Sequence, residues 1–273
     1  GKERGRGDPS PCGPAAARPS IRHRNSFGIR KMSDDVLSQL APTGVLRAGI
    51  NMANKLLVTG ETPSGEPDGV GPEFARNIAE RLGVPVAYVP FPTPGDLADA
   101  VEAGVWDIGL IGAEPTRAEK IEFTAAYVEI EATYLVPEGS PLKTIEDVDA
   151  EGIRIAVSGR SAYDLYLSRS LKHAELVRAQ GLPGALELFL NEKLDALAGL
   201  RPALNTDIGK VPGGRILDGR FTAVQQAVGT AKANAAAAEF LSRFVEEAKT
   251  DGRVAALIEK HGVVGRLSVA PPA

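Results

Sequence analysis

Short apolar runs alternate along most of the chain with longer segments in which apolar residues recur every three or four positions. Runs such as 45–51 and 107–111 predict buried strands, whereas the spacing within 69–83 predicts an amphipathic helix that ends at Gly83. Strands that alternate with helices are typical of a parallel sheet with helical crossovers. The pattern therefore predicts an α/β fold.

The same patterns place the remaining elements. Strands are expected at 84–91, at 127–137, at the start of 151–167, at the end of 187–200 and around 222–230. Helices are expected around 95–104, at the end of 151–167, at the start of 187–200 and twice within 231–262, with a short capped helix at Thr144 to Asp147. Two strand–helix series joined by two long strands indicate either two lobes or one larger α/β enzyme domain.

Composition adds limits on the class of protein. The 273 residues are 43% hydrophobic and 24% charged, which is ordinary for a soluble globular protein. No run of about 18 apolar residues is present, so we expect no membrane-spanning helix. Length alone allows one domain or two.

Charge is distributed unevenly along the chain. The formal net charge is −4, and residues 1–31 carry eight basic and two acidic side chains, so residues 32–273 carry −10. An acidic body is unsuited to a phosphate backbone, and we expect no nucleic-acid partner. Residues 1–31 are rich in Gly, Pro, Ser and Arg, which predicts a disordered basic tail. This tail lacks the apolar stretch of a secretory signal, and Met32, just before a predicted helix start, is a candidate initiator.

Few residues in the chain suit metal or redox chemistry. Cys12 is the single cysteine, which excludes an intrachain disulfide. The three histidines, His23, His173 and His261, are scattered without the spacing of metal ligands. We therefore expect no metal and no cofactor, and no Ser-His-Asp set or Gly-rich phosphate loop points to an enzyme.

The strongest candidate for binding chemistry is Arg117. It follows the buried strand 107–111 and the break at Gly112, so it lies just past the carboxyl end of a strand. In open α/β sheets ligands bind at that end, and a guanidinium offers a planar fork that matches a carboxylate. The alternative is a surface arginine in a loop salt bridge.

The segment around Arg117 resembles a block of family 3 extracellular solute-binding proteins, the polar-amino-acid receptors of ABC importers. The matching positions are Asp107, Gly112, Thr116, Arg117, Phe123, Thr124 and Tyr127. The gap between Gly112 and Arg117 is about two residues shorter than is usual in the family. The resemblance covers roughly 43–265 and implies a two-lobed type II periplasmic-binding-protein fold, or Venus flytrap, with two hinge-crossing strands.

This resemblance also implies a division of the chain. The first lobe would comprise 43–134 and 223–265, and the second lobe 135–222. Residues 266–273, which end in Pro and Ala, would form a frayed C-terminal tail.

Site residues carry over from the family position by position. Arg117 would grip a carboxylate of the ligand, beside Thr116, and backbone groups of Gly112 and Ala113 would bond its polar ends. In the second lobe, the turn with Ser158, Arg160 and Ser161 would complete the carboxylate site at a helix start. Asn54 stands near the position where relatives place an aromatic residue.

Two departures bear on the ligand. Leu200 occupies the position where amino-acid receptors carry the Asp that holds the ammonium, and Arg201 follows it. Glu114 is an acceptor for an amine, a partner for Arg117 or a solvated loop residue. The ligand is therefore either a small organic acid without an amine, slightly favoured, or an amino acid whose ammonium pairs with Glu114.

The family also suggests partners and a location. We expect a monomer that binds a small carboxylate ligand and delivers it to an ABC permease of the inner membrane. The family implies the periplasm, although this sequence shows no signal peptide, and the alternative is a cytoplasmic ligand-sensing module. A further alternative is an enzyme like cyclohexadienyl dehydratase on the same scaffold, with Glu114 as proton donor.

Overall fold

The computed structural model describes Met32–Ala273, which form one compact unit. The expected disorder of residues 1–31 and the absence of a signal there lie outside the described residues. Within Met32–Ala273, none of the helices combines the length and the hydropathy that crossing a membrane requires.

The chain alternates helices and strands as its apolar pattern predicts. The α-helices are α1 Asp34–Leu40, α2 Val70–Leu82, α3 Pro94–Asp99, α4 Ala162–Ser170, α5 Gly181–Asn191, α6 Arg201–Asp207, α7 Ala235–Thr250 and α8 Arg253–Lys260. The 3-10 turns are η1 Ala100–Ala103, η2 Arg117–Glu119, η3 Glu146–Val148 and η4 Ile208–Lys210. The strands are β1 Leu46–Asn51, β2 Gly60–Glu61, β3 Pro67–Asp68, β4 Val86–Phe91, β5 Ile108–Gly112, β6 Ile121–Phe123, β7 Val128–Val136, β8 Arg154–Ser158, β9 Glu175–Ala179, β10 Ala196–Leu200, β11 Arg215–Ile216, β12 Thr222–Ala231 and β13 Ser268–Val269.

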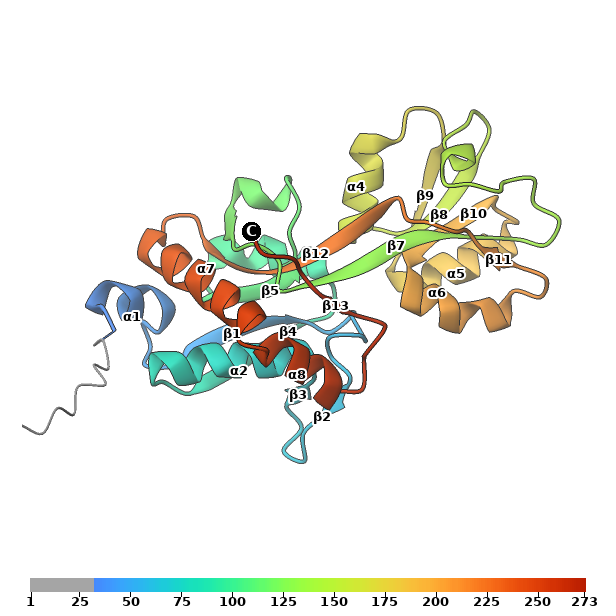
Figure 1. Ribbon diagram of the computed structural model, residues 1–273. Helices are drawn as coiled ribbons and strands as arrows, with labels where there is room; N and C mark the ends of the chain where they lie inside the picture. The colour runs from blue at the N-terminus through green and yellow to red at the C-terminus, as the bar shows by residue number, and fades with distance from the viewer. Residues whose placement is uncertain (1–31) are drawn as a thin grey trace, which may run out of the picture. The chain divides into compact units, whose positions relative to one another are not determined.

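The main sheet runs through two lobes in the order β4-β1-β5-β12-β7-β10-β8-β9. Strands β4, β1 and β5 are parallel and form the first lobe with α1, α2, α3, α7 and α8, and strands β10, β8 and β9 form the second lobe with α4, α5 and α6. The long strands β7 and β12 pair antiparallel with each other and pass between the lobes, as Figure 1 shows in green and orange. The predicted α/β fold with two crossing strands is therefore confirmed. The residue boundaries predicted for the lobes stay a prediction.

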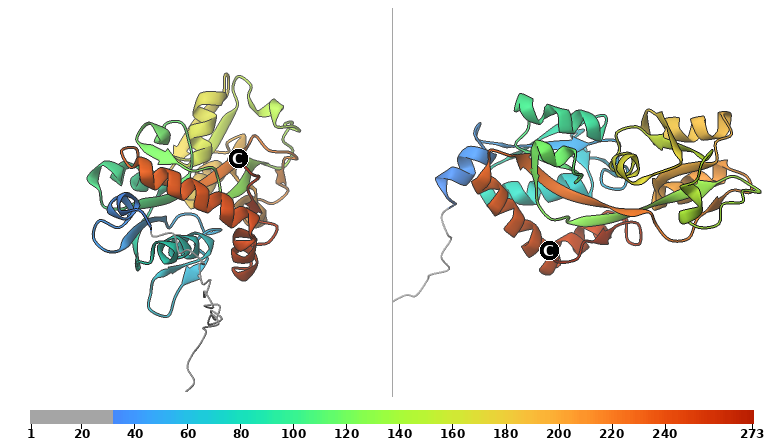
Figure 2. Two further views of the ribbon diagram at one scale, coloured as in Figure 1. Left: turned by 60° about the vertical axis from the view of Figure 1, so that its left-hand side comes forward. Right: turned by 90° about the horizontal axis from the view of Figure 1, so that it is seen from above.

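Each lobe buries apolar side chains on both faces of its part of the sheet. In the first lobe, α2, α7 and α8 cover one face, and α3 with Trp106 covers the other. In the second lobe, α4 packs on one face, and α5 and α6 pack on the other. Figure 2 shows the two groups of helices from two further directions. Because both faces are covered, the strands are nearly continuous apolar runs, as parallel strands require.

Most predicted elements lie within a few residues of their observed bounds. The helix predicted at 69–83 is α2, and Gly83 ends it with a left-handed φ of 73°. The capped turn is also present, since the Thr144 hydroxyl accepts from the Asp147 N–H at 3.3 Å. The pattern missed β9 and α6, which are short and carry weak periodicity.

The expectation of a frayed C-terminal tail is wrong. Ser268 and Val269 pair with β7, and the Ala270 N–H donates to the Tyr127 carbonyl at 3.1 Å. The Lys249 ammonium, which is buried, donates to the Pro271 carbonyl at 2.9 Å. These backbone hydrogen bonds hold a segment whose Pro and Ala residues gave no sign of a strand.

Tyr127 lies at the centre of the first-lobe core. Its ring stacks on Phe74 with the centroids 4.6 Å apart, and its hydroxyl is buried without a hydrogen-bond partner within Met32–Ala273. Burial raises the pKa of this hydroxyl above its usual value. Tyr127 matches the family block in sequence, and in the structure it packs in the core of the first lobe.

Replacing Tyr127 by Phe should therefore stabilise the fold. Removing an unpaired buried hydroxyl while keeping the ring should raise the free energy of unfolding by about 1 kcal/mol in urea titrations. Tyr88→Phe is the matched control, because the Tyr88 hydroxyl donates to the Pro72 carbonyl at 2.9 Å and its loss should lower stability. A less stable Tyr127→Phe variant would show that the hydroxyl has a partner.

Candidate functional site

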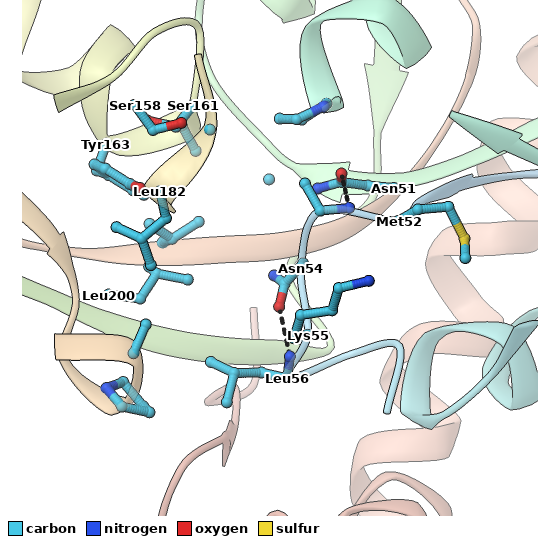
Figure 3. Close-up of a pocket in the computed structure, with 18 of the residues that line it drawn as sticks. Asn51, Met52, Asn54, Lys55, Leu56, Ser158, Ser161, Tyr163, Leu182 and Leu200 are labelled. Carbon is cyan, nitrogen blue, oxygen red and sulfur yellow. Dashed lines mark hydrogen bonds between the residues drawn. The ribbon is translucent and has the colours of Figure 1, made fainter. Parts of the chain in front are cut away.

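A cavity of about 680 Å³ lies between the two lobes. The first lobe lines it with the loop after β1 and with Gly112 and Arg117, and the second lobe lines it with the turn after β8 and with residues of α5 and α6. Figure 3 shows Asn51, Asn54 and Leu56 on one side and Ser158, Tyr163 and Leu200 on the other. A cavity of this size is typical of sites for small organic ligands.

The Arg117 guanidinium is the buried charge of this cavity. It opens η2, five residues after the end of β5, and its side chain is folded back toward that strand. It donates to the Gly112 carbonyl at 2.8 Å and to the Arg160 carbonyl, in the second lobe, at 2.8 Å. Burial lowers its pKa to about 10, while Glu114 acts in the opposite direction, so the group is cationic at neutral pH.

Backbone carbonyls are dipoles without net charge, so they compensate the charge of this guanidinium only in part. The surface salt bridge considered for Arg117 is absent within Met32–Ala273, where its hydrogen bonds go to carbonyls alone. A guanidinium has five N–H donors in a planar fork, and two are engaged here. The arrangement suits an anion that enters from the cavity.

The turn after β8 is the part of the second lobe that contacts Arg117. Ser161 caps α4, because its hydroxyl accepts from the Asp164 N–H at 3.1 Å. Asp164 is buried and accepts from the Arg160 N–H at 2.7 Å and from the Arg178 Nε at 3.0 Å. These bonds hold Arg160 at a φ of 63°, in the left-handed region. The Arg160 carbonyl therefore reaches Arg117, while Ser158 and Ser161 line the cavity.

Two further polar groups line the cavity beside Gly112. Gln226 is 4% exposed and pairs in register with Gly112 across β12 and β5. Its side-chain amide makes no hydrogen bond within Met32–Ala273, unlike that of Gln225, which donates to Glu129 at 2.9 Å. Burial raises the pKa of Tyr163 to about 12, against the opposing effect of the Ser161 and Ser158 hydroxyls. Gln226 thus offers an unused donor and acceptor to a ligand.

The structure brings about half of the predicted site residues to this cavity. Those that line it are Asn54, Gly112, Arg117, Ser158, Ser161 and Leu200. The predicted residues outside its lining are Ala113, Glu114, Thr116, Arg160 and Arg201. The roles of all of them in binding stay predictions.

Each residue outside the lining has another contact. Glu114 forms an ion pair with Arg169 of the second lobe, and Arg201 binds Glu131 at 3.0 Å. The Ala113 N–H donates to the Gln225 carbonyl at 2.7 Å. Thr116 and Arg160 line a neighbouring cavity of about 420 Å³ that also contacts Arg117.

The sequence analysis missed Gln226, Tyr163 and Leu182 as lining residues. A signal for Gln226 was present, since Val224, Gln226 and Val228 share one face of a strand and a polar residue on an apolar face is unusual. Leu182 lies in the first turn of α5, a helix of which the sequence pattern located only the end.

Comparison with known proteins identifies the class. The model of bacterial extracellular solute-binding proteins, family 3, matches residues 46–264. The fold is that of type II periplasmic binding proteins. The chain belongs to family 3 of the bacterial extracellular solute-binding proteins. No curated protein matches the sequence.

Solved structures share the fold at low sequence identity. A mutant of ArgBP from T. maritima is 22% identical with a TM-score of 0.67, over 83% of this chain and 99% of that one. The ancestral amino acid-binding protein AncCDT-1, a precursor of cyclohexadienyl dehydratase, is 22% identical with a TM-score of 0.66, over 82% and 98%. The substrate binding protein of an amino acid ABC transporter is 20% identical with a TM-score of 0.65, over 80% and 99%.

Gly112 sets how closely the lobes approach beside Arg117. A Cβ there would lie 2.8 Å from the Ala162 Cβ of the second lobe and 3.0 Å from the Val224 Cγ1. Gly112→Ala should therefore lower the free energy of unfolding by about 1–3 kcal/mol, measured in urea. Gly60→Ala is the control, since a Cβ at Gly60 meets nothing within 4 Å. Equal stability of the two variants would contradict close contact of the lobes at Gly112.

Proposed function

We propose that the protein is the solute-binding receptor of an ABC importer and captures a small carboxylate-bearing ligand in the cavity between its lobes. The observation that carries the proposal is the buried Arg117 guanidinium, whose hydrogen bonds go to backbone carbonyls alone, with no carboxylate in direct contact among the described residues. A carboxylate that enters the cavity supplies the missing negative charge in a bidentate pair. Family membership supports the receptor role.

The surrounding groups support a carboxylate at this position. Ser158 and the N-terminus of the nine-residue helix α4, capped by Ser161, line the cavity from the second lobe. Free N–H groups at a helix start attract anions. The Gln226 amide, on the crossing strand β12, lies at the same polar end of the cavity. This end therefore has donors from both lobes and from a crossing strand. Because this end needs both lobes, a ligand bound here favours their approach.

The permease partner, the periplasmic location and the monomeric state follow from the same proposal. The family description names extracellular proteins, and a receptor of this class delivers its solute to a membrane permease. The dehydratase-like alternative needs a proton donor in the cavity. Its candidate, Glu114, is paired with Arg169 and lies outside the cavity lining, which favours binding over catalysis.

Substitution of Arg117 tests the carboxylate site. Arg117→Met should lower the affinity for a carboxylate at least about a hundredfold, and Arg117→Lys about tenfold, because Lys keeps the charge without the fork. A thermal-shift screen of organic acids and amino acids supplies the carboxylate, and calorimetry measures the affinity.

The control for this experiment is Arg243→Met, which removes an exposed arginine of α7. Circular dichroism of each variant separates lost binding from lost folding. Unchanged affinity in a folded Arg117→Met variant would remove Arg117 from the site.

The lowered pKa of Arg117 predicts a pH dependence. Burial disfavours the cation, so the charge is complete at neutral pH and is lost as the pH rises through about 10. Carboxylate affinity should be constant from about pH 6 to 8.5 and should fall about tenfold per unit above pH 10. The ¹³Cζ resonance of Arg117, assigned with Arg117→Lys, should titrate in the same range. An Arg117 that remains charged above pH 12 would contradict the lowered pKa.

A further inference from the structure

The charges that line the cavity are unbalanced. Its basic residues are Lys55, Arg117, Lys210 and Arg266, and its acidic residue is Asp207. Residues 32–273 together carry −10, so an excess of cations at this cavity runs against the composition of the body. The four cations come from four separate segments, which are the loop after β1, η2, η4 and the segment after α8.

The one acidic residue of the lining, Asp207, already forms an ion pair. The Asp207 Oδ1 accepts from the Lys210 ammonium at 3.2 Å, and Asp207 is buried. A ligand ammonium in this cavity would compete with Lys210 for that carboxylate and would face the remaining cations. The lining therefore opposes a second positive charge on the ligand.

Lys55 and Arg266 are the cations without a partner at the cavity. Both are exposed, and neither forms an ion pair within Met32–Ala273. Their neighbours Leu56 and Leu267 are buried in the core of the first lobe, so the backbones of both cations are anchored in that lobe.

Apolar side chains lie beyond the Arg117 end of the cavity. Arg117 binds the carbonyl of Arg160, which lies in the turn between Ser158 and Ser161. Figure 3 shows Ser158 and Ser161 at one end of the second-lobe wall and Leu200 at the other, with Leu182 between Tyr163 and Leu200. A ligand that extends from Arg117 therefore places an apolar body against Leu182 and Leu200.

We infer that the solute is a dicarboxylate without an ammonium group, held at one end by Arg117 and at the other by Lys55 with Arg266. This inference rests on the proposed function. It names the charge of the ligand's second end, which the carboxylate site alone leaves open.

Matched chain lengths test the inference by calorimetry at low salt. The dicarboxylates range in chain length from pentanedioate to decanedioate. Each is compared with the monocarboxylate of the same chain length and with the 2-amino derivative of that monocarboxylate. At the length that spans the cavity, the dicarboxylate should bind at least about tenfold more tightly than the monocarboxylate. The 2-amino monocarboxylate and L-lysine should bind more weakly than either.

Lys55→Met should weaken dicarboxylate binding about fivefold and reduce its salt dependence, with the monocarboxylate unaffected. Lys232→Met, which removes an exposed lysine outside the cavity lining, should change neither. Arg117→Met should abolish binding of both acids.

Each other result has a separate meaning. The inference of a dicarboxylate is overturned by equal affinity for the two acids, by tighter binding of an amino acid, or by no effect of Lys55→Met. The proposed receptor function still stands in these cases if Arg117→Met abolishes binding. Binding that survives Arg117→Met overturns the carboxylate site itself. Calorimetry still detects weak binding directly at a ligand concentration of 1 mM. If no dicarboxylate binds at that concentration, the inference is also overturned.

Discussion

The account depends on one buried guanidinium that touches both lobes. Arg117 donates to the Gly112 carbonyl at the end of β5 and to the Arg160 carbonyl in the turn before α4. Burying a cation is costly unless partners compensate it, and two neutral carbonyls compensate it incompletely. The lowered pKa of Arg117 expresses this cost. The molecule thus holds a charged group where a ligand anion would relieve its desolvation.

Much of the surrounding structure serves to place that guanidinium. Asp107 accepts from the Arg47 N–H at 2.8 Å and pairs with the Arg47 side chain at 2.7 Å, which fixes the start of β5 against β1. The Thr124 hydroxyl accepts from the Val228 N–H at 3.2 Å and so ties the segment after Arg117 to β12. Asp107 and Thr124 of the sequence block are therefore structural supports around the one residue of the block that we propose binds the ligand. Asp107, Thr124 and Tyr127 of this block each have a separate packing or hydrogen-bonding role.

Contacts between the lobes lie on one side of the cavity. Arg160 reaches Asp99 of α3 at 2.8 Å, and Arg169 pairs with Glu114. The Arg160 guanidinium also lies over Gly95, where a Cβ would be 2.7 Å from its Cζ. These pairs are partly exposed, so each of them contributes little to the free energy of the contact between the lobes. Glu114, Arg160 and Arg201 were natural ligand candidates from sequence, but each finds a protein partner that sequence spacing does not reveal.

The sequence predicted the fold well because period and length identify strands and helices in long, strongly apolar segments. The end of a strand in an α/β unit indicated Arg117, and the family resemblance added Ser158 and Ser161; all three line the cavity. A polar Gln226 on an apolar strand face was a signal in the sequence, but its place beside Gly112 depends on the register of β12 against β5. Arg266 comes near the cavity through the pairing of β13. Both placements depend on the pairing of segments that are distant in the sequence, which the pattern within one segment does not specify by itself.

Native mass spectrometry of the protein, purified from the cells that express it without dialysis, tests the central claim most directly. The account predicts an added mass that, on release, is an organic acid with a free carboxylate, and its loss from Arg117→Met protein that remains folded. A bound solute without a carboxylate, or a carboxylate retained equally by the Arg117→Met variant, would contradict it.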